Sequence, residues 1–241
     1  MLRNWEQLPE YMRNEDVRKY YDIVKKKKLS LVAKRVFDFI VALLMLIMLS
    51  PVFIVVAVMI KVDSKGPVMF RQVRITQYGR EFRIFKFRTM VNNAAELGSQ
   101  VTTKNDMRVT KVGKKIRGCR LDELPQLINV LLGDMTFVGT RPEVPKYVKE
   151  YTDEMYATLL LPAGITSECS IRYKDEDKLL ADAENADEVY VKKVLPQKMK
   201  YNLKSIERFS FFRANTKSEE VVVESYLLSI VETKELFITY V

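Results

Sequence analysis

An uncharged apolar run of 22 residues, 39–60, separates Asp38 from Lys61 near the start of this 241-residue chain. As one straight helix the run would reach roughly 33 Å, which is enough to cross the hydrocarbon core of a bilayer. Ser50-Pro51 lies near its middle, and proline removes a backbone hydrogen bond and clashes with the preceding helical turn. The run therefore predicts two half-helices joined by a break, within a membrane segment over residues 34–62.

Basic residues flank this run on both sides. They are Arg18, Lys19, Lys25 to Lys28, Lys34 and Arg35 before it, and Lys61, Lys65, Arg71, Arg74 and Arg80 after it. Because positive charge is retained on the cytoplasmic side of a membrane, matched flanks favour a re-entrant hairpin with both chain termini cytoplasmic. The alternative is a buried core helix of a soluble domain. A secretory signal fits less well, because the run starts late and no small-residue cleavage site follows it.

The composition narrows the chemistry. Histidine is absent, which excludes Ser-His-Asp and Cys-His catalysis and zinc bound by histidine. Cys119 and Cys169 have no metal-ligand spacing and form no disulfide framework, so both are expected to be packing residues. A net charge of +9 indicates an anionic partner: nucleic acid, anionic lipid or a phosphorylated substrate. Any chemistry must then rest on carboxylates, cations or a hard metal ion.

The adjacent acids Asp122 and Glu123 precede a helical spacing of apolar residues that closes at Gly133. These apolar positions are Leu124, Leu127, Ile128, Leu131 and Leu132. Three arginines flank the pair in sequence: Arg117, Arg120 and Arg141. We expect the helix dipole and the arginines to lower the pKa of both carboxyls, leaving each ionised as a nucleophile or a metal ligand. The alternative is that Asp122 is only the N-cap of the helix.

Two short strands, 68–73 and 81–89, are predicted around a turn at residues 77–80. The period of two places Lys86 and Arg88 on one face of the second strand, where two cations suit a diphosphate. An exposed basic strand face is the alternative. Further along, a polar loop containing Asp106 and Arg108 leads toward the acid pair.

Pro142 and Pro145 stiffen a turn beside Arg141, whose planar guanidinium suits bidentate phosphate binding. Another turn is predicted at residues 162–165, and a solvated acidic helix at 175–188. Residues 1–33, with Pro9 near their start, predict a polar helix that lies on an anionic membrane surface or in solvent. The basic and apolar segment from Val189 onward predicts either membrane contact or packing on the domain.

Seven blocks of the sequence, in this order, resemble the bacterial sugar transferases, a family of monotopic phosphoglycosyl transferases. The blocks are Lys34-Arg35 with Asp38, Ser50-Pro51, Gly66-Pro67-Val68 leading to Phe70-Arg71-Gln72, Lys86 to Met90, Asp106 with Arg108, Leu121 to Leu127, and Gly133-Asp134-Met135 with Arg141-Pro142-Glu143. The resemblance covers residues 34–145 and continues more weakly to 212. Thr140 departs from the family's usual Gly-Pro-Arg-Pro turn, and the chain diverges beyond Phe212.

The resemblance implies an α+β, mostly helical monotopic membrane protein with a re-entrant helix broken at Ser50-Pro51, interfacial helices and a short β-hairpin. The expected division is an N-terminal interfacial helix (1–33), the membrane helix (34–62), a cytoplasmic catalytic domain (63–212) and a divergent tail (213–241). The expected location is the cytoplasmic face of the bacterial inner membrane, with membrane lipids as partners. A homodimer is compatible with the family, and no nucleic-acid partner is expected.

The activity that the resemblance implies is transfer of a sugar 1-phosphate from a UDP-sugar to polyprenyl phosphate, with release of UMP. Asp122 corresponds to the family's covalent nucleophile, and Glu123 assists it together with Mg²⁺ held by the acid pair. Phosphate-binding cations of the family match Lys86, Arg117 and Arg141, to which the strand pattern adds Arg88. Asp106, Arg108 and Glu143 are expected to support the site. Neither the sugar nor the glycan pathway follows from the sequence.

Two other functions remain open from the residues. A membrane-anchored binder of polyanions or nucleic acid would also explain the positive charge, and its binding would weaken steeply with salt. A magnesium-dependent phosphohydrolase would release sugar phosphate to water without any lipid acceptor.

Overall fold

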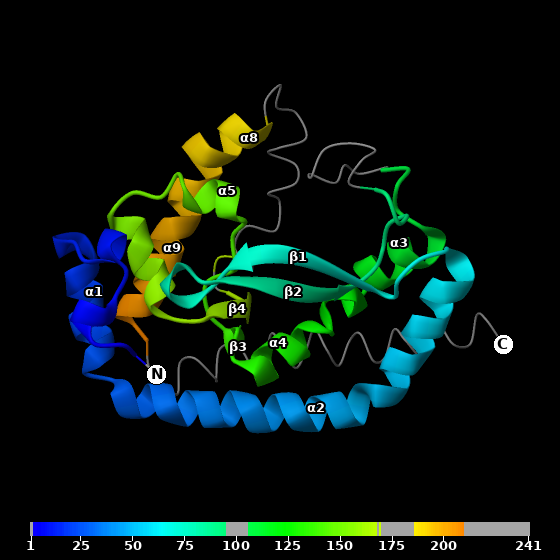
Figure 1. Cartoon of the computed structure of the whole chain (residues 1–241), viewed down its shortest axis with the longest axis horizontal. Coiled ribbons are helices and arrows are strands. Elements are labelled where there is room, and N and C mark those ends of the chain that lie inside the picture. The colour runs from blue at the N-terminus through cyan, green and yellow to red at the C-terminus, as the bar shows by residue number, and fades with distance from the viewer. Residues whose placement is uncertain (1, 95–105, 168, 170–185, 210–241) are drawn as a thin grey trace.

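The structure is a computed structural model that describes residues 2–94, 106–167, 169 and 186–209. The described chain is mostly helical, with two small sheets above the long helix α2 (Lys28–Asp63) (Figure 1). The predicted mostly helical α+β class is confirmed. The acidic stretch 175–185 and the tail 213–241 lie outside the described residues.

Helix α2 continues through Pro51 as one helix of 36 residues, whereas the sequence predicts two half-helices. Figure 1 shows that α2 bends in its second half, so that both of its ends lead up into the rest of the fold. Pro51 has no N–H to offer the carbonyl of Ile47, four residues earlier. The Ser50 hydroxyl donates to that same carbonyl at 2.8 Å. The serine therefore satisfies the carbonyl that the proline leaves without its helical partner.

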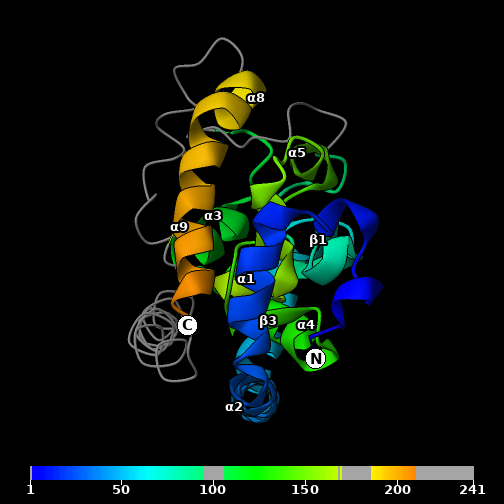
Figure 2. The same cartoon turned by 90° about the vertical axis from the view of Figure 1, so that its left-hand side faces the viewer.

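Much of the apolar surface of α2 is not covered by protein. Only 17% of its most apolar 18-residue window is buried, and it is the one helix among the described residues long and apolar enough to cross a membrane. Figure 2 shows α2 almost end-on at one side of the molecule. A core helix of a soluble domain would bury most of this surface, so the exposure fits a lipid-facing helix. Its large exposed side chains are Leu29, Val32, Val36, Phe39, Ile40, Leu43, Leu44, Ile47, Met48, Ile54, Val58 and Val62.

The first turns of α2 are anchored by buried polar contacts. Lys34 and Asp38 form a buried ion pair at 3.0 Å, and Asp38 also accepts a hydrogen bond from Thr136 of strand β3 (Met135–Val138). The guanidinium of Arg35 donates to the last carbonyls of α4 (Gln126–Leu132). These contacts fix α2 against the elements that carry the acid pair.

The far end of α2 is held in a similar way. Asp63 accepts a hydrogen bond at 2.9 Å from the backbone N–H of Val112 in α3 (Lys111–Gly118). Arg88 donates to the carbonyls of Ser64 and Lys65, just after the helix. Both ends of the apolar helix are therefore attached to the same folded body.

The N-terminal segment differs from the single helix predicted over residues 1–33. It forms 3₁₀ turns η1 (Trp5–Gln7) and η2 (Glu10–Met12) and then α1 (Glu15–Lys25), whose N-cap Asn14 accepts from the Val17 N–H at 2.8 Å. The buried face of α1 packs beside the 3₁₀ helix η5 (Glu154–Leu160) and α9 (Leu195–Glu207). The apolar faces of α1 and α9 therefore pack within the domain. The buried residues of α1 are Val17, Tyr20, Tyr21 and Val24.

Strands β1 (Met69–Ile75) and β2 (Glu81–Phe87) form the predicted antiparallel hairpin, joined through η3 (Gln77–Gly79). Phe70 lies opposite Lys86, and Arg74 lies opposite Phe82. Because side chains alternate along a strand, Arg74 and Lys86 belong to the same face of the hairpin. The side chain of Asn129, in α4, bonds the free edge of β2 by accepting from Phe85 N–H at 2.9 Å and donating to the Arg83 carbonyl at 3.0 Å.

The turn predicted at residues 162–165 is wrong, because β4 (Ala163–Thr166) pairs there in parallel with β3. Beside this pair the chain approaches itself closely: Gly164 N–H donates to the Thr140 carbonyl at 2.8 Å. A Cβ on Gly164 would lie 2.2 Å from the nitrogen of Gly139, so only glycine fits. This contact fixes the start of the loop that carries Arg141. Short helices α5 (Pro145–Val148) and α8 (Ala186–Val189), the 3₁₀ turn η4 (Leu121–Glu123) and the π-helical turn η6 (Tyr190–Val194) complete the described elements.

Candidate active site

The acid pair lies in the 3₁₀ turn η4 (Leu121–Glu123), between α3 and α4. Arg120 has a left-handed backbone (φ 54°) that turns the chain sharply at this point. Leu121 and Leu124 are buried on either side of the acids and anchor the turn in the core. The N-cap of α4 is Pro125, so the alternative that Asp122 merely caps this helix is wrong. The predicted helix itself is confirmed, and it ends at Gly133 (φ 82°).

Glu123 is held by two cations. Its Oε1 lies 2.8 Å from Lys86 Nζ and 3.3 Å from Arg141 Nη2, whereas Oε2 accepts no hydrogen bond from the described residues. Burial opposes ionisation of this carboxyl, but Lys86 and Arg141 outweigh burial and lower its pKa well below the usual range. The lowered pKa predicted for Glu123 is therefore confirmed.

The pKa of Asp122 moves in the opposite direction from the prediction. Burial and the neighbouring Glu123 carboxylate raise it to about 6, against the opposing effect of Lys86 and Arg117. The sequence shows the flanking cations but not the loss of solvent around the carboxyl, and the loss of solvent is the larger effect. At pH 7 the ionised form still exceeds the protonated form by roughly ten to one.

Lys86, Arg117 and Arg141 converge on the acid pair from three different elements: strand β2, helix α3 and the loop after β3. Lys86 and Arg141 contact Glu123 directly. Arg117 acts electrostatically on both Asp122 and Asp106. The structure thus brings together the three cations that the family resemblance implied.

Arg88 lies elsewhere. It is 5% exposed and donates to the carbonyls after α2, and no hydrogen bond or ion pair in the described part of the chain joins it to Asp122 or Glu123. Side chains alternate along β2 as predicted, but β2 ends at Phe87, so Arg88 lies just beyond the strand. Lys86 contacts Glu123, whereas Arg88 donates to the carbonyls that follow α2.

Asp106 and Arg108 pair with each other. The guanidinium of Arg108 donates to both carboxylate oxygens, at 2.6 and 2.9 Å for the shortest contact to each, and it also donates to the Ala94 carbonyl at 3.0 Å. Arg108 thereby lowers the pKa of Asp106 to about 2. The pair organises the loop that enters α3, from which Arg117 projects.

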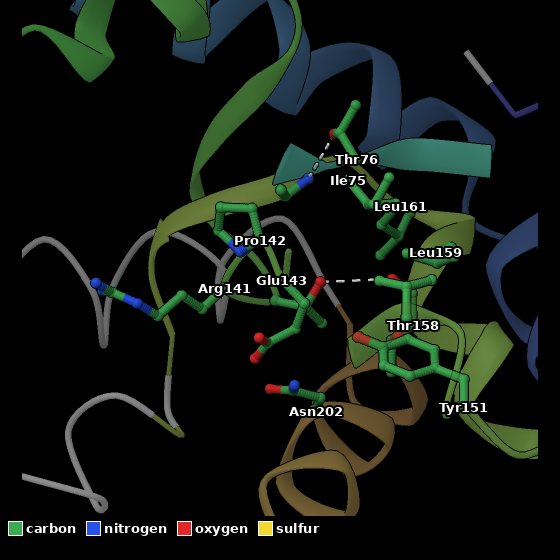
Figure 3. Close-up of a pocket in the computed structure, with 13 residues that line it drawn as sticks. Ile75, Thr76, Arg141, Pro142, Glu143, Tyr151, Thr158, Leu159, Leu161 and Asn202 are labelled. Atoms are coloured by element: carbon green, nitrogen blue, oxygen red, sulfur yellow. Dashed lines mark hydrogen bonds between the residues drawn. The ribbon is translucent and has the colours of Figure 1, made fainter. Parts of the chain in front are cut away.

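Glu143 anchors the loop that carries Arg141. Its buried carboxylate accepts from the Tyr190 hydroxyl at 2.7 Å and lies 3.4 Å from Lys198 Nζ. Its carbonyl accepts from the Ile75 N–H at 2.9 Å. In Figure 3 the side chain of Arg141 points away from this anchored part of the loop, while Glu143 lines a small pocket beside it. Glu143 therefore supports Arg141 through the backbone.

A second small pocket borders the cations of the acid pair. Its lining includes Arg74 and Gln126, two residues that the sequence reasoning did not assign to the site. Arg74 could have been assigned to the site from the hairpin register, because this register places Arg74 on the same face as Lys86. Nothing local to the sequence distinguishes Gln126, whose position depends on how α4 packs under the hairpin.

Few of the described side chains could bind a metal ion together. Among the described residues no group of three or more carboxylates or cysteines gathers in one place. Asp122 and Glu123 nevertheless fit Mg²⁺, which is commonly bound by one or two carboxylates while substrate phosphates and water complete its octahedron. The raised pKa of Asp122 also marks a carboxylate that a nearby cation would stabilise.

Comparison with known proteins identifies the class. A family model described as "Bacterial sugar transferase" matches residues 29–212, so the chain belongs to the bacterial sugar transferase family. Among its relatives, a putative undecaprenyl-phosphate N-acetylgalactosaminyl 1-phosphate transferase of Bacillus subtilis (strain 168) is 36% identical over 159 residues, 66% of this chain and 87% of that protein.

Other relatives are longer proteins. A UDP-N-acetylgalactosamine-undecaprenyl-phosphate N-acetylgalactosaminephosphotransferase of Aeromonas hydrophila is 45% identical over 133 residues, 54% of this chain and 31% of that protein. A UDP-glucose:undecaprenyl-phosphate glucose-1-phosphate transferase of Klebsiella pneumoniae is 43% identical over 141 residues, covering 57% of this chain and 30% of that protein. The match thus spans less than a third of these two proteins.

Proposed function

We propose that this protein transfers a sugar 1-phosphate from a UDP-sugar to polyprenyl phosphate, giving a polyprenyl diphosphate sugar and UMP. The family membership and the names of its relatives support this activity. The observation that carries it is the convergence of Lys86, Arg117 and Arg141 on a partly buried Asp-Glu pair. Both substrates are anionic phosphates, and converging cations lower their repulsion.

Asp122 is the nucleophile in this proposal. Glu123 is tied to two cations, whereas no ion pair or side-chain hydrogen bond holds the Asp122 carboxylate among the described residues. An Asp122 oxygen bonds the phosphorus next to the sugar, and the bond from that phosphorus to the bridging oxygen breaks. UMP leaves with the electron pair, and the sugar phosphate remains on Asp122.

Polyprenyl phosphate then completes the transfer. One of its phosphate oxygens bonds the same phosphorus, and the bond to Asp122 breaks. Both nucleophiles are already ionised, so neither step needs a general base, which fits a chain without histidine. Bound Mg²⁺ would supply positive charge that neutralises the diphosphate. Asp122 and Glu123 would hold it from the protein side.

The same site is proposed to lie at the headgroup depth of the bacterial inner membrane, on its cytoplasmic face. The apolar surface of α2, its bend and the attachment of both its ends to one body support a re-entrant helix that continues through Ser50-Pro51 and bends in its second half. Such a helix would present the acid pair both to a lipid phosphate in the bilayer and to a nucleotide sugar in water.

The first half-reaction tests the assignment. With a UDP-sugar and Mg²⁺ but no lipid acceptor, wild-type protein should release at most one UMP per active site, and Asp122→Asn should release none. Asp153→Asn removes the same charge from an exposed aspartate and should behave as wild type. Normal UMP release by Asp122→Asn would refute the nucleophile. Continuous release of free sugar phosphate would instead identify a phosphohydrolase.

A further inference from the structure

The pocket beside the acid pair gathers three cations on one side. Arg74, Lys86 and Arg141 all line it, together with Gln126. None of its lining residues is acidic. Apolar and backbone surface completes the wall, contributed by Ile84, Pro142, Gly164 and Ile165.

One buried donor in this pocket has no hydrogen-bond partner, and a side-chain amide lines the pocket with it. The amide belongs to Gln126, which is 2% exposed. Arg74 uses its terminal nitrogens to donate to the Gln72 side chain at 2.8 Å and to the Pro142 carbonyl at 3.3 Å, but its buried Nε has no partner. Buried donors are normally satisfied, since an unmet one costs about 1–3 kcal/mol. A ligand with acceptor oxygens would satisfy Arg74 Nε and could also accept from the Gln126 amide.

The charge of the pocket specifies what kind of acceptor fits. Lys86 and Arg141 pair with Glu123, which lies outside the lining, and Glu143 acts electrostatically on Arg74. The lining itself holds three cations and no carboxylate, which favours an anion, and the guanidinium and amide donors suit the oxygens of a phosphate. Arg74 also interacts electrostatically with both Arg141 and Glu123. The pocket is therefore electrostatically continuous with the acid pair.

The pocket's position distinguishes between the two phosphates of a nucleotide sugar. Asp122 does not line it, although Lys86 and Arg141 border both the pocket and the acid pair. The phosphorus that Asp122 attacks must lie at Asp122, which leaves the pocket for the neighbouring phosphate of the donor.

We propose that Arg74 and Gln126, with Lys86 and Arg141, form a subsite for the phosphate that departs with the nucleoside. This inference rests on the proposed function. When the bond between phosphorus and the bridging oxygen breaks, the electron pair stays on the departing phosphate, which becomes a dianion without any proton transfer. Arg74 and Gln126 donate to its oxygens and stabilise the charge that develops there.

UMP with Mg²⁺ is the direct probe of this subsite. Arg74→Met and Gln126→Leu should each weaken UMP binding, measured by calorimetry, by roughly 10- to 100-fold, because each removes a donor to a charged oxygen. Arg74→Lys keeps the charge and should recover part of the loss. Arg83→Met removes an exposed cation from the opposite face of the same hairpin and should bind UMP as wild type does.

The rates of the two half-reactions show whether the subsite binds a phosphate of the UDP-sugar or the phosphate of the lipid acceptor. The variants should slow adduct formation from a UDP-sugar without acceptor, while transfer from a preformed adduct to polyprenyl phosphate should remain within about twofold of wild type. Unfolding midpoints equal to that of Arg83→Met would show intact folding, and Gln126→Leu leaves the contacts of Arg74 in place.

Three results would overturn the subsite. One is UMP binding by Arg74→Met and Gln126→Leu that equals that of Arg83→Met. Another is slowing of only the second half-reaction, which would assign the pocket to the lipid phosphate. The third is weak binding by misfolded Arg74→Met with normal binding by folded Gln126→Leu. Because UMP binding is measured without turnover, it tests the subsite even if wild-type protein forms no adduct and the proposed function fails.

Discussion

Asp122 and Glu123 are neighbours in the chain but have different surroundings. Lys86 and Arg141 hold Glu123 ionised, while burial beside Glu123 raises the pKa of Asp122 to about 6. The first carboxylate to become protonated on acidification is therefore Asp122. A raised pKa also makes a carboxylate a stronger nucleophile once it is ionised, which suits Asp122 to attack on phosphorus.

This difference predicts the pH dependence of adduct formation. In the proposed mechanism the ionised form of Asp122 reacts, so the rate should be nearly constant above pH 7 and fall at lower pH. Mg²⁺ held by the acid pair favours the ionised carboxylate, so a higher Mg²⁺ concentration should move this fall to lower pH. The first half-reaction without acceptor is the measurement, since the lipid phosphate then cannot contribute a titration. Recovery of the rate on return to pH 7 controls for unfolding. A rate that increases as the pH falls from 8 to 5 would contradict the assignment.

The sequence predicts much of the site chemistry because the motifs are local. The acid pair, Lys86 and Arg141 were identifiable as charged residues in short blocks. Three other features depend on packing between segments that are distant in the sequence. They are the raised pKa of Asp122, the hydrogen bonds from Arg88 to the end of α2, and the position of the Gln126 amide in a pocket. Residue type alone does not report how much solvent a side chain loses.

Helix α2 is attached to the catalytic body by a buried ion pair. Lys34 and Asp38 lie one turn apart, and Thr136 of β3 donates to Asp38. Burying two charges is unfavourable, and the attraction between them offsets this desolvation free energy only while both partners are present. The contact therefore couples the position of α2 to the strand that precedes the Arg141 loop.

Removing one partner of this pair should destabilise the fold. Asp38→Leu leaves the Lys34 ammonium buried without its carboxylate, so the free energy of unfolding in detergent should fall by about 3–5 kcal/mol. The double variant Lys34→Met/Asp38→Leu should recover most of that loss. A single variant as stable as wild type would show that the pair does not hold α2 in place.

The elements were predicted unevenly, for physical reasons. The hairpin and α4 follow from alternation and helical spacing, which are local signals. Strands β3 and β4 have four residues each, and their parallel pairing joins Met135 to Ala163 across a long connection, so no local pattern reveals it. Continuity of α2 through Pro51 was also not predicted. There the Ser50 hydroxyl satisfies the carbonyl that the proline leaves free.

In the part of the chain that the structure describes, α2 presents a large lipid-compatible surface, and both ends of α2 return to the same body. A re-entrant arrangement predicts that tags before Met1 and after Val241 are both accessible only from the cytoplasmic side. Impermeant labelling of intact cells, with permeabilised cells as the control, measures this. A C-terminal tag labelled in intact cells while the N-terminal tag stays protected would establish a spanning helix instead.

Intact mass spectrometry tests covalent transfer through Asp122 most directly. Purified protein would be incubated with Mg²⁺ and a panel of UDP-sugars without lipid acceptor. We expect one donor to add the mass of a single sugar phosphate to wild-type protein, with the adduct mapped to Asp122 and absent from Asp122→Asn. Addition of polyprenyl phosphate should then remove it. Turnover to the lipid product by an enzyme that never carries this mass, or that carries it in Asp122→Asn, would contradict the mechanism.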